Sequence, residues 1–387
     1  MSKIYENLIR SVLFKTPPET AHEFGIEALK LGLSSKLARD FAAKQFACNE
    51  FGELKRFGLT FKNPLGIAAG FDKNGKVVNH LAALGFGFVE VGTVTFEAQR
   101  GNEKPRLFRL PEDKALINRL GFNNEGTFKV VERLKRTNRN CVLGVNIGKN
   151  KDVPNEKAIE NYLKSFDLAF EVADYIAVNV SSPNTPNLRE LQKADALEEL
   201  LSALQKRNQE LSGVLSSDLS RLNSKHTRQK PPEGGTQNKT LLVKIAPDLS
   251  EGEVEAVVDV CLRLKISGII ATNTTVLRNN LQTNKAKVER IGNGGLSGKP
   301  LQMRSNEIIK QIYKTSKGKL PIVGVGGIFT AEDAFEKIAS GACLLQSYTG
   351  FIYQGFTFAR DVNFGLVKIL RQKGFQHLDE AVGTAVS

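Results

Sequence analysis

The sequence is poor in the residues that usually build metal and disulfide sites. Its 4 cysteines stand far apart without a Cys-x-x-Cys pair, and it has only 4 histidines and no tryptophan. This usage predicts reduced thiols in a cytosol-like compartment and no metal site. No run of about eighteen apolar residues is present, so no transmembrane helix is expected. The N-terminus also lacks the apolar core and the cleavage site of a secretory signal.

Basic residues exceed acidic ones, with 54 Lys and Arg against 41 Asp and Glu and a net charge of +13. They are scattered, and the densest basic stretch, residues 221–239, has no interleaved aromatic residues, so no nucleic-acid partner is expected. A solvated surface is one interpretation of this charge. Attraction to an anionic membrane surface or to an acidic substrate is the alternative.

Eight short apolar segments recur along the chain, each of a length usual for a buried strand. Most intervals between them contain an amphipathic helical pattern, such as residues 194–209 and 252–264. This alternation predicts an α/β fold, a (β/α)8 TIM barrel, in preference to a doubly wound sheet. Nearly every segment ends in polar or glycine residues, which in a barrel would meet at one mouth. The segments are residues 65–70, 88–94, 142–148, 175–181, 241–247, 268–274, 321–328 and 344–351.

Two parts of the chain fall outside the predicted barrel, which spans residues 51–387. Residues 1–50 carry an apolar stripe over residues 4–13, and Thr16-Pro-Pro-Glu19 predicts a capping box with Pro17 at the first position of a second helix. These N-terminal amphipathic helices either pack on the barrel or form a cap with an apolar inner face at a membrane. Residues 211–239 are predicted to be a polar, flexible surface insertion without chemistry.

The segment Ala177-Val-Asn-Val-Ser-Ser-Pro-Asn-Thr-Pro186 runs from a buried strand into a loop of amides, hydroxyls and prolines. The loop has no Cys, His or carboxylate, so any proton transfer there must use a hydroxyl such as that of Ser182. Lys244 lies inside an apolar run and needs a counter-charge, for which an anionic ligand is the expected partner. The glycine-rich turns at residues 324–328 and 344–350 predict a phosphate cradle, with ordinary tight turns as the alternative.

The chain resembles class 2, quinone-dependent dihydroorotate dehydrogenases almost from end to end. The likeness rests on ordered matches that include Asn63-Pro-Leu-Gly-Ile-Ala-Ala-Gly-Phe-Asp-Lys-Asn-Gly75, Asn118-Arg-Leu-Gly-Phe-Asn123, the loop after Ala177 and Val243-Lys-Ile-Ala-Pro-Asp-Leu249. Only residues 211–239 and the extreme C-terminus depart from the family pattern. The resemblance implies oxidation of (S)-dihydroorotate to orotate in the synthesis of UMP, with FMN as the cofactor and a membrane quinone as the electron acceptor.

The resemblance also implies where each reactant is held. The implied FMN contacts are Ala69, Gly70, Phe71, Asp72, Lys73, Thr93, Asn146, Asn179, Lys244, Thr272, Gly298, Gly327, Tyr348 and Thr349. The implied contacts to dihydroorotate or orotate are Lys73, Asn118, Arg119, Leu120, Gly121, Phe122, Asn179, Asn184, Asn273 and Thr274. His22, Arg109 and Tyr348 would be the polar groups of a quinone tunnel.

By the same resemblance Ser182 is the general base that takes the C5 proton, with Lys73 and Lys244 as charged partners of the reaction. A serine hydroxyl is a poor base in water, so it needs an onward route for its own proton and stabilisation of the developing enolate. Class 1 relatives use cysteine there and lack the N-terminal helices. The serine and the helices together predict ubiquinone or menaquinone as the electron acceptor. They also predict a peripheral protein on the cytoplasmic side of a membrane, and a monomer is the expected oligomeric state.

Two other interpretations are left open by the residues themselves. One is another FMN barrel oxidoreductase, such as a dihydropyrimidine or dihydrouridine reductase. The other is a non-catalytic, membrane-associated barrel. The intact Ser182, Lys73 and Lys244 argue against the second of these.

Overall fold

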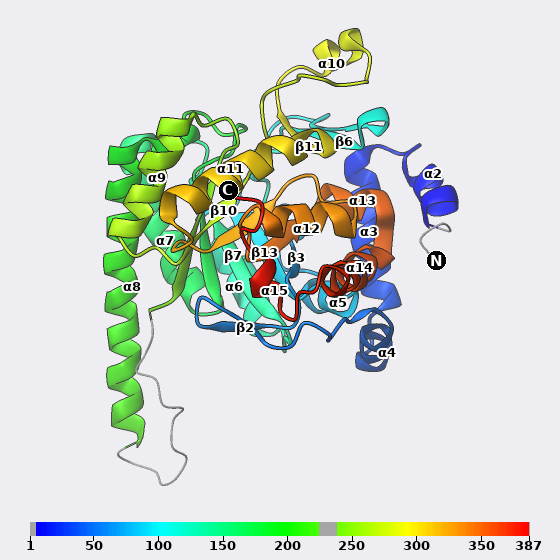
Figure 1. Ribbon diagram of the computed structural model, residues 1–387. Coiled ribbons are helices and arrows are strands. Elements are labelled where there is room, and N and C mark those ends of the chain that lie inside the picture. Colours follow the sequence, from blue (N-terminus) through cyan, green and yellow to red (C-terminus); the bar gives the residue numbers. More distant parts are fainter. Residues whose placement is uncertain (1–4, 224–237, 387) are drawn as a thin grey trace.

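Eight parallel strands close into a barrel in the computed structural model of the chain, which describes residues 5–223 and 238–386 (Figure 1). The barrel order is β10-β12-β13-β3-β4-β7-β8-β9. Nearly all residues of these strands are buried, because side chains fill the barrel on one face and meet the surrounding helices on the other. The strands are β3 Leu65–Ile67, β4 Phe88–Val94, β7 Val142–Ile147, β8 Tyr175–Asn179, β9 Thr240–Ile245, β10 Gly268–Ala271, β12 Ile322–Val325 and β13 Leu344–Ser347.

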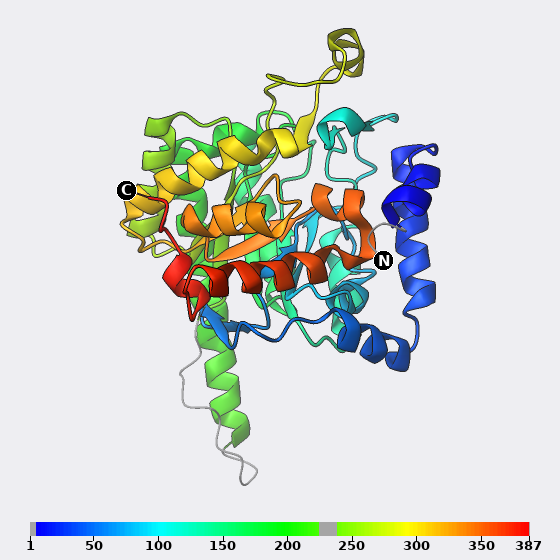
Figure 2. The ribbon, with the colours of Figure 1, turned by 45° about the vertical axis from the view of Figure 1, so that its right-hand side comes forward.

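Helices cover the outside of the barrel, except α10, which stands away from it, and a helix follows each of its strands along the chain (Figures 1 and 2). Their bounds are α5 Val78–Ala83, α6 Thr127–Lys135, α7 Ala158–Phe170, α8 Ala194–Asn223, α9 Glu251–Arg263, α10 Lys285–Ile291, α11 Gln302–Ser316, α12 Ala331–Ala339, α13 Thr349–Gln354, α14 Phe358–Gln372 and α15 Leu378–Ala381. The predicted (β/α)8 barrel is therefore confirmed, and each of the eight apolar segments matches one barrel strand, with β9 beginning one residue before its segment. Several predicted segments continue past the end of their strand, since the residues that follow leave the ladder to form the loops of the mouth.

The N-terminal helices lie side by side with the barrel and not within it, as the blue ribbon shows in both views (Figures 1 and 2). They are a π-helical turn at Tyr5–Ile9, α2 Arg10–Leu13, α3 Pro18–Gly32 and α4 Lys36–Phe46. The two predicted helices are present, with Ile4 outside the described residues, and α4 is a third that the sequence analysis did not predict.

The predicted capping box at Thr16 is wrong. Helix α3 begins one residue later than predicted, with Pro17 as its N-cap and no capping hydrogen bond from a side chain. The Thr16 hydroxyl instead donates to the Leu13 carbonyl at 2.8 Å. The Glu19 carboxylate faces the barrel, where it accepts from the Arg106 guanidinium at 2.9 Å.

The prediction of a flexible insertion over residues 211–239 is wrong for its first part. Helix α8 continues through Asn223, and its end projects beyond the barrel (Figures 1 and 2). Residues 224–237 lie outside the described residues. Where the chain returns, the Asn208 side chain accepts from the Lys239 amide at 2.9 Å and donates to the Lys239 carbonyl at 2.7 Å. One amide thus fastens the start of β9 to α8.

Two small sheets accompany the barrel and were not predicted from the sequence. Strands β1 Leu54–Arg56 and β2 Leu59–Phe61 form one, and strands β5 Leu107–Leu110, β6 Ala115–Asn118 and β11 Gly295–Gly298 form the other. The second sheet contributes Leu107, Leu116 and Asn118 to the mouth of the barrel.

Candidate active site

A cavity of about 1050 Å³, open solvent at its mouth included, lies at the carboxyl ends of the barrel strands, where enzymes of this fold hold their reactants. Most of the residues predicted to bind a ligand line it. They are Ala69, Gly70, Lys73, Thr93, Asn118, Leu120, Gly121, Phe122, Asn179, Ser182, Asn184, Lys244, Thr272, Asn273, Thr274, Gly298, Gly327, Tyr348 and Thr349. Segments far apart in the sequence therefore meet around one space.

The loop that follows β8 holds Ser182 in this lining. Its side chain is 5% exposed, and its hydroxyl oxygen accepts from the Asn184 backbone amide at 3.2 Å. The Asn184 side chain turns across the mouth and donates to Asn118 Oδ1 at 3.1 Å, which connects the β8 loop with β6. The hydroxyl that the sequence analysis predicted for proton transfer is thus buried in an amide-rich lining.

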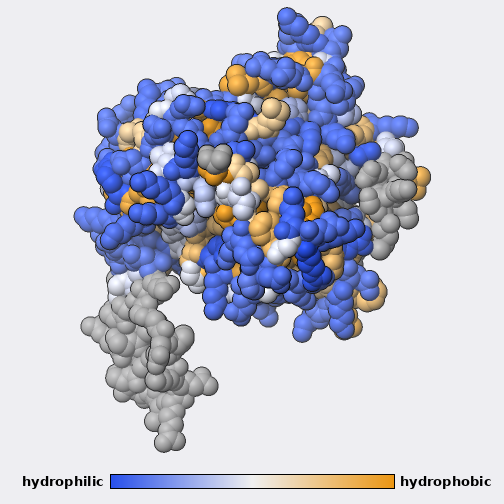
Figure 3. All heavy atoms as spheres, in the orientation of Figure 1, coloured by the Kyte–Doolittle hydropathy of each residue, from blue (hydrophilic) through white to orange (hydrophobic). Residues whose placement is uncertain are grey.

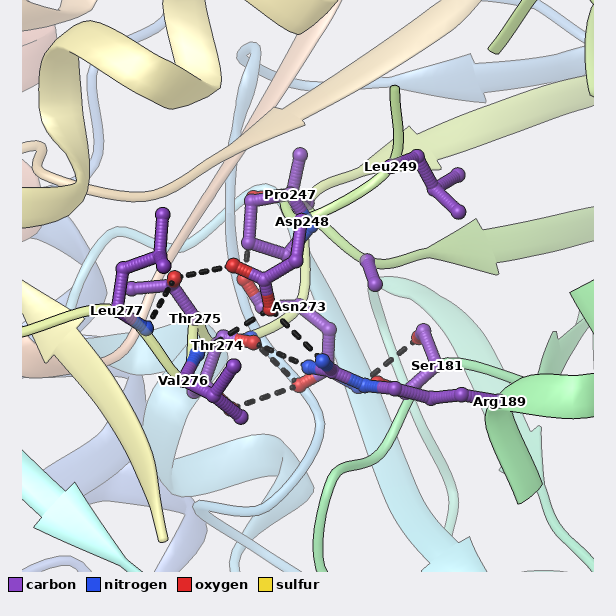
Figure 4. Close-up of polar contacts among 12 residues, drawn as sticks. Ser181, Arg189, Pro247, Asp248, Leu249, Asn273, Thr274, Thr275, Val276 and Leu277 are labelled. Carbon is purple, nitrogen blue, oxygen red and sulfur yellow. Dashed lines mark hydrogen bonds and ion pairs between the residues drawn. The ribbon is translucent and has the colours of Figure 1, made fainter. Parts of the chain in front are cut away.

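The β8 loop is fastened to its neighbours by Arg189, which the sequence analysis did not single out (Figure 4). The guanidinium donates to the Ser181 carbonyl at 3.1 Å, to Asp248 Oδ2 at 2.7 Å and to the Thr274 carbonyl at 2.9 Å. The Asp248 carboxylate also accepts from the Thr275 hydroxyl and from the Val276 backbone amide. The loops after β8, β9 and β10 are thus joined at one ion pair.

Lys73 and Lys244 place two ammonium groups on the cavity lining. Burial lowers the pKa of Lys73 to about 8, with the carboxylate of Glu19 opposing and the guanidinium of Arg106 assisting this shift. Lys244 is 5% exposed, and burial lowers its pKa as well, against the attraction of Glu90. The lining therefore suits an anionic ligand.

The expected partner of Lys244 was wrong. An anionic ligand was expected to supply the counter-charge, but the Glu90 carboxylate of β4 lies 3.9 Å from the Lys244 ammonium. Glu90 is fully buried and lies within an apolar run, Phe88-Val-Glu-Val91. The reasoning applied to Lys244 would have found it, because a charge inside a buried strand needs a partner.

Two glycines on the lining, Gly298 at the end of β11 and Gly327 after β12, leave room for a ligand to approach the backbone closely. Gly327 has φ +76°, and a Cβ atom there would lie 2.4 Å from Gln302 Cβ; Gly298 has φ +101°. Next to them the Ser297 and Thr349 hydroxyls are 2.9 Å apart on the lining. Gln346, also on the lining, has a buried carbonyl oxygen without a hydrogen-bond partner among the described residues. A ligand N–H donor would satisfy it.

Four residues predicted to contact FMN or orotate do not line this cavity. The Arg119 guanidinium turns outward to the Ile291 and Asn293 carbonyls. The Asp72 carboxylate accepts from the Lys76 and Val77 amides at 2.8 and 2.7 Å and so shapes its own turn. Asn146 lies beneath the lining, where it accepts from Thr93 at 2.6 Å. Phe71 faces a second cavity instead.

That second cavity, of about 1500 Å³, lies between the N-terminal helices and the barrel and is lined largely by apolar side chains. Of the three residues predicted for a quinone tunnel, His22 and Arg109 line this cavity and Tyr348 lines the first one. Burial lowers the pKa of His22 to about 3, assisted by the charge of Lys73, so its imidazole is neutral at physiological pH. Leu107 and Leu116 line both cavities, which therefore meet at the β5–β6 hairpin.

Comparison with known proteins agrees with these features. The family model described as dihydroorotate dehydrogenase matches residues 53–370. The dihydroorotate dehydrogenase (quinone) of Christiangramia forsetii is 47% identical over 363 residues, covering 93% of this chain and 98% of the relative. That of Gloeobacter violaceus is 46% identical and covers 98% and 99%. A crystal structure of the Eimeria tenella enzyme with ferulenol superposes with a TM-score of 0.77 at 38% identity, covering 92% of this chain and 98% of that one.

Fold and site define a (β/α)8-barrel oxidoreductase whose polar cavity at the strand ends adjoins an apolar one beneath N-terminal helices. The chain belongs to the dihydroorotate dehydrogenase family, as a member of its quinone-dependent class, which acts in pyrimidine biosynthesis. Members of this family are flavoenzymes. Within the described ranges, no helix is both long and apolar enough to span a bilayer.

Proposed function

We propose that the polar cavity holds FMN and dihydroorotate together, and that the adjoining apolar cavity receives the quinone. The observation that carries this proposal is the meeting of the two cavities at Leu107 and Leu116. One side has Ser182 and two lysines, and the other is apolar with a neutral His22. A polar and an apolar reactant can thus approach one cofactor from different sides.

The lining fits FMN in the chemistry of its groups. The positive-φ glycines at 298 and 327, with the Thr349 hydroxyl, would hold the phosphate, and Ala69 and Gly70 offer a flat surface for the ring. Lys73, Lys244 and the Gln346 carbonyl oxygen would meet the polar edge of the ring. Held by these residues, FMN would supply the acceptor for the hydride from C6 of dihydroorotate and a donor of electrons to the quinone.

Ser182 is the general base of this proposal: it takes the C5 proton of dihydroorotate while its own hydroxyl proton passes to water at the open mouth of the cavity. Its hydroxyl is buried and already accepts from the Asn184 amide, so its position is fixed before substrate binds. Lys73 stabilises the negative charge that develops as the proton leaves, and Lys244 stabilises the charge of the reduced cofactor. The side chains of Asn118, Asn179, Asn184 and Asn273 offer donors and acceptors to the edges of the pyrimidine ring.

Residues 1–50 form the quinone access region in this proposal, and residues 51–387 the catalytic barrel. The N-terminal helices expose large apolar side chains, namely Leu8, Val12, Phe24, Leu31, Leu37 and Phe41. Basic residues such as Lys30, Lys36 and Lys44 accompany them, a combination suited to an anionic membrane surface. By contrast, the face in Figure 3 is mostly hydrophilic. We place the protein, as a monomer, on the cytoplasmic side of the membrane with ubiquinone or menaquinone as acceptor.

Anaerobic reduction followed by a panel of acceptors tests this function. The purified protein should be yellow, and dihydroorotate should bleach it. Reoxidation should follow with ubiquinone or menaquinone and not with fumarate or NAD⁺. A preparation that stays yellow with dihydroorotate would refute the proposal, and bleaching by dihydrouracil or by dihydrouridine would favour one of the other FMN barrel reductases.

A further inference from the structure

A chain of hydrogen bonds runs beneath the polar cavity and ends at Glu90. Asn273 Nδ2 donates to Asn179 Oδ1 at 3.3 Å, and Asn179 Nδ2 donates to Thr93 Oγ1 at 2.9 Å. The Thr93 hydroxyl donates to Asn146 Oδ1 at 2.6 Å, and Asn146 Nδ2 donates to Glu90 Oε1 at 2.9 Å. Every donor in the chain points toward the carboxylate.

The other neighbours of the Glu90 carboxylate are donors too. The Tyr175 hydroxyl and Gln346 Nε2 donate to Oε2 at 2.9 and 2.7 Å, and the Lys244 ammonium lies 3.9 Å from Oε1. Among the described residues, each of these neighbours is a group that can donate to the carboxylate. The contacts come from β7, β8, β9 and β13, so Glu90, on β4, joins its own strand to four others of the barrel below the cavity.

A carboxylate that only accepts has a consequence for each amide along the chain. Asn146 must turn its nitrogen to Glu90, so its oxygen faces Thr93, and the Thr93 hydroxyl must donate to it. Asn179 must then offer its nitrogen to Thr93 and its oxygen to Asn273. The backbone amides of Ser181 and Thr274 donate to the oxygens of Asn179 and Asn273 at 3.3 and 2.8 Å, which agrees with this direction. Gln346, held by its nitrogen, leaves its oxygen unpaired on the lining.

We propose that Glu90 is a positioning residue for the dehydrogenase reaction. Its buried charge fixes the donor and acceptor direction of the amides that face the ligands, and it offsets the positive charge of Lys244. The carboxylate itself does not line the cavity, so it acts through Asn146, Thr93, Asn179, Gln346 and Lys244. This inference rests on the proposed binding of FMN and orotate in that cavity.

Glu90→Gln tests the proposal, because the amide keeps the shape of the side chain but removes its charge and can donate as well as accept. The loss of charge leaves Lys244 uncompensated, which favours the anionic reduced flavin. We expect the equilibrium constant for reduction of bound FMN to increase at least tenfold. This change corresponds to a rise of about 30 mV in the midpoint potential of a two-electron couple. The dissociation constant of orotate, measured from the flavin spectrum, should rise at least tenfold.

Matched variants separate positioning from a merely structural effect. Asp113→Asn removes another buried carboxylate, one that accepts from the Gln282 and Thr283 amides outside the cavity lining, and should leave the potential and the orotate affinity unchanged. Asn146→Leu interrupts the chain at Glu90 but keeps the Glu90 charge, so it should weaken orotate binding without the rise in potential expected for Glu90→Gln. This second variant also provides the test if Glu90→Gln does not retain FMN.

A double-variant cycle tests whether the chain itself carries the effect. Thr93→Val interrupts it between Glu90 and Asn179. The double variant Glu90→Gln/Thr93→Val should bind orotate no more weakly than Thr93→Val alone, while its potential still shifts as in Glu90→Gln. The inference about Glu90 is overturned if the wild type bleaches with dihydroorotate and Glu90→Gln leaves both the potential and the orotate affinity unchanged. That result would leave the proposed function intact. A wild type that fails to bleach refutes the proposed function instead.

Discussion

Arg189 and Asp248 form an ion pair with 2.7 Å between guanidinium nitrogen and carboxylate oxygen at the point where three loops of the barrel mouth meet. The pair has Ser181 on one side and Thr274 on the other (Figure 4). The group proposed to take the proton and the groups proposed to hold the pyrimidine ring are therefore fastened to each other, although they follow different strands.

Loss of this pair should impair the reductive half-reaction alone. Arg189→Met and Asp248→Asn are expected to slow flavin reduction by dihydroorotate and to weaken orotate binding, each by about tenfold or more, since small displacements of reacting groups are costly. Reoxidation of the same enzyme by quinone should keep its rate. Stopped-flow measurement of both half-reactions gives the comparison. Arg207→Met, which breaks the bidentate pair of Arg207 with Asp167 outside the site, is the matched control.

Ser182→Ala should keep FMN and orotate binding and lose flavin reduction. Removal of a general base costs about 10²- to 10⁴-fold in rate, and no Cys, His or carboxylate in this loop can replace it. Single-turnover reduction by dihydroorotate under anaerobic conditions measures the loss. Ser340→Ala serves as control, because that buried hydroxyl donates to the Glu336 carbonyl at 2.7 Å and lies outside the cavity lining. Near-normal reduction in Ser182→Ala would contradict its role.

Orotate binding should weaken as the pH rises above about 8. The pKa of Lys73 in the free enzyme is lowered to about 8, so below that pH its ammonium is ready to pair with the anion. Above it, binding must first return a proton to the lysine, and the dissociation constant should rise about tenfold per pH unit. Titrations from about pH 7 to about pH 9.5 measure this slope. Lys73→Met should bind weakly without the slope. Lys76→Met, at an exposed lysine paired with Glu125, should retain it.

Glu19→Gln should impair the quinone half-reaction more than the reduction by dihydroorotate. The Glu19 carboxylate joins α3 to Arg106, the residue before Leu107, and Leu107 lines both cavities. Weakening that pair should shift α3 against the hairpin and lower kcat/KM for a quinone by about tenfold. Anaerobic reduction by dihydroorotate should stay within about twofold at about pH 6, where Lys73 keeps its proton although the loss of Glu19 lowers its pKa further. Glu27→Gln, which disturbs only an exposed pair with Lys30 on the same helix, is the control. Equal loss in both half-reactions would contradict the assignment.

The barrel could be predicted from the sequence because each strand is buried on both faces and therefore appears as a continuous apolar run. Most ligand-binding groups were predictable for a related reason: they follow those runs and meet at one mouth. The β5–β6–β11 sheet was not predictable. Its strands are too short for a clear alternation of apolar and polar residues, and β11 lies far along the chain from β5 and β6. The capping box failed at Thr16 because Glu19 finds a tertiary partner in Arg106, which no local pattern reveals.

The contacts of Glu90 and Arg189 could not be predicted from single segments of the sequence. Glu90 was visible as a charge in an apolar run, and only the paired strands showed that Lys244 and Asn146 converge on it. Arg189 lies in a polar stretch with many charged neighbours, so nothing in the sequence separates it from solvated arginines. Its function follows from three acceptors contributed by three loops.

The double hydrogen bond between Asn208 and Lys239 has a practical consequence for studying the protein on lipid. It fastens the chain just before β9 at the amino-terminal end of the barrel, opposite the polar cavity. A fluorescent reporter could therefore be inserted between these residues without disturbing the reactants. Energy transfer from that reporter to labelled lipids would then measure how the molecule is oriented on a vesicle.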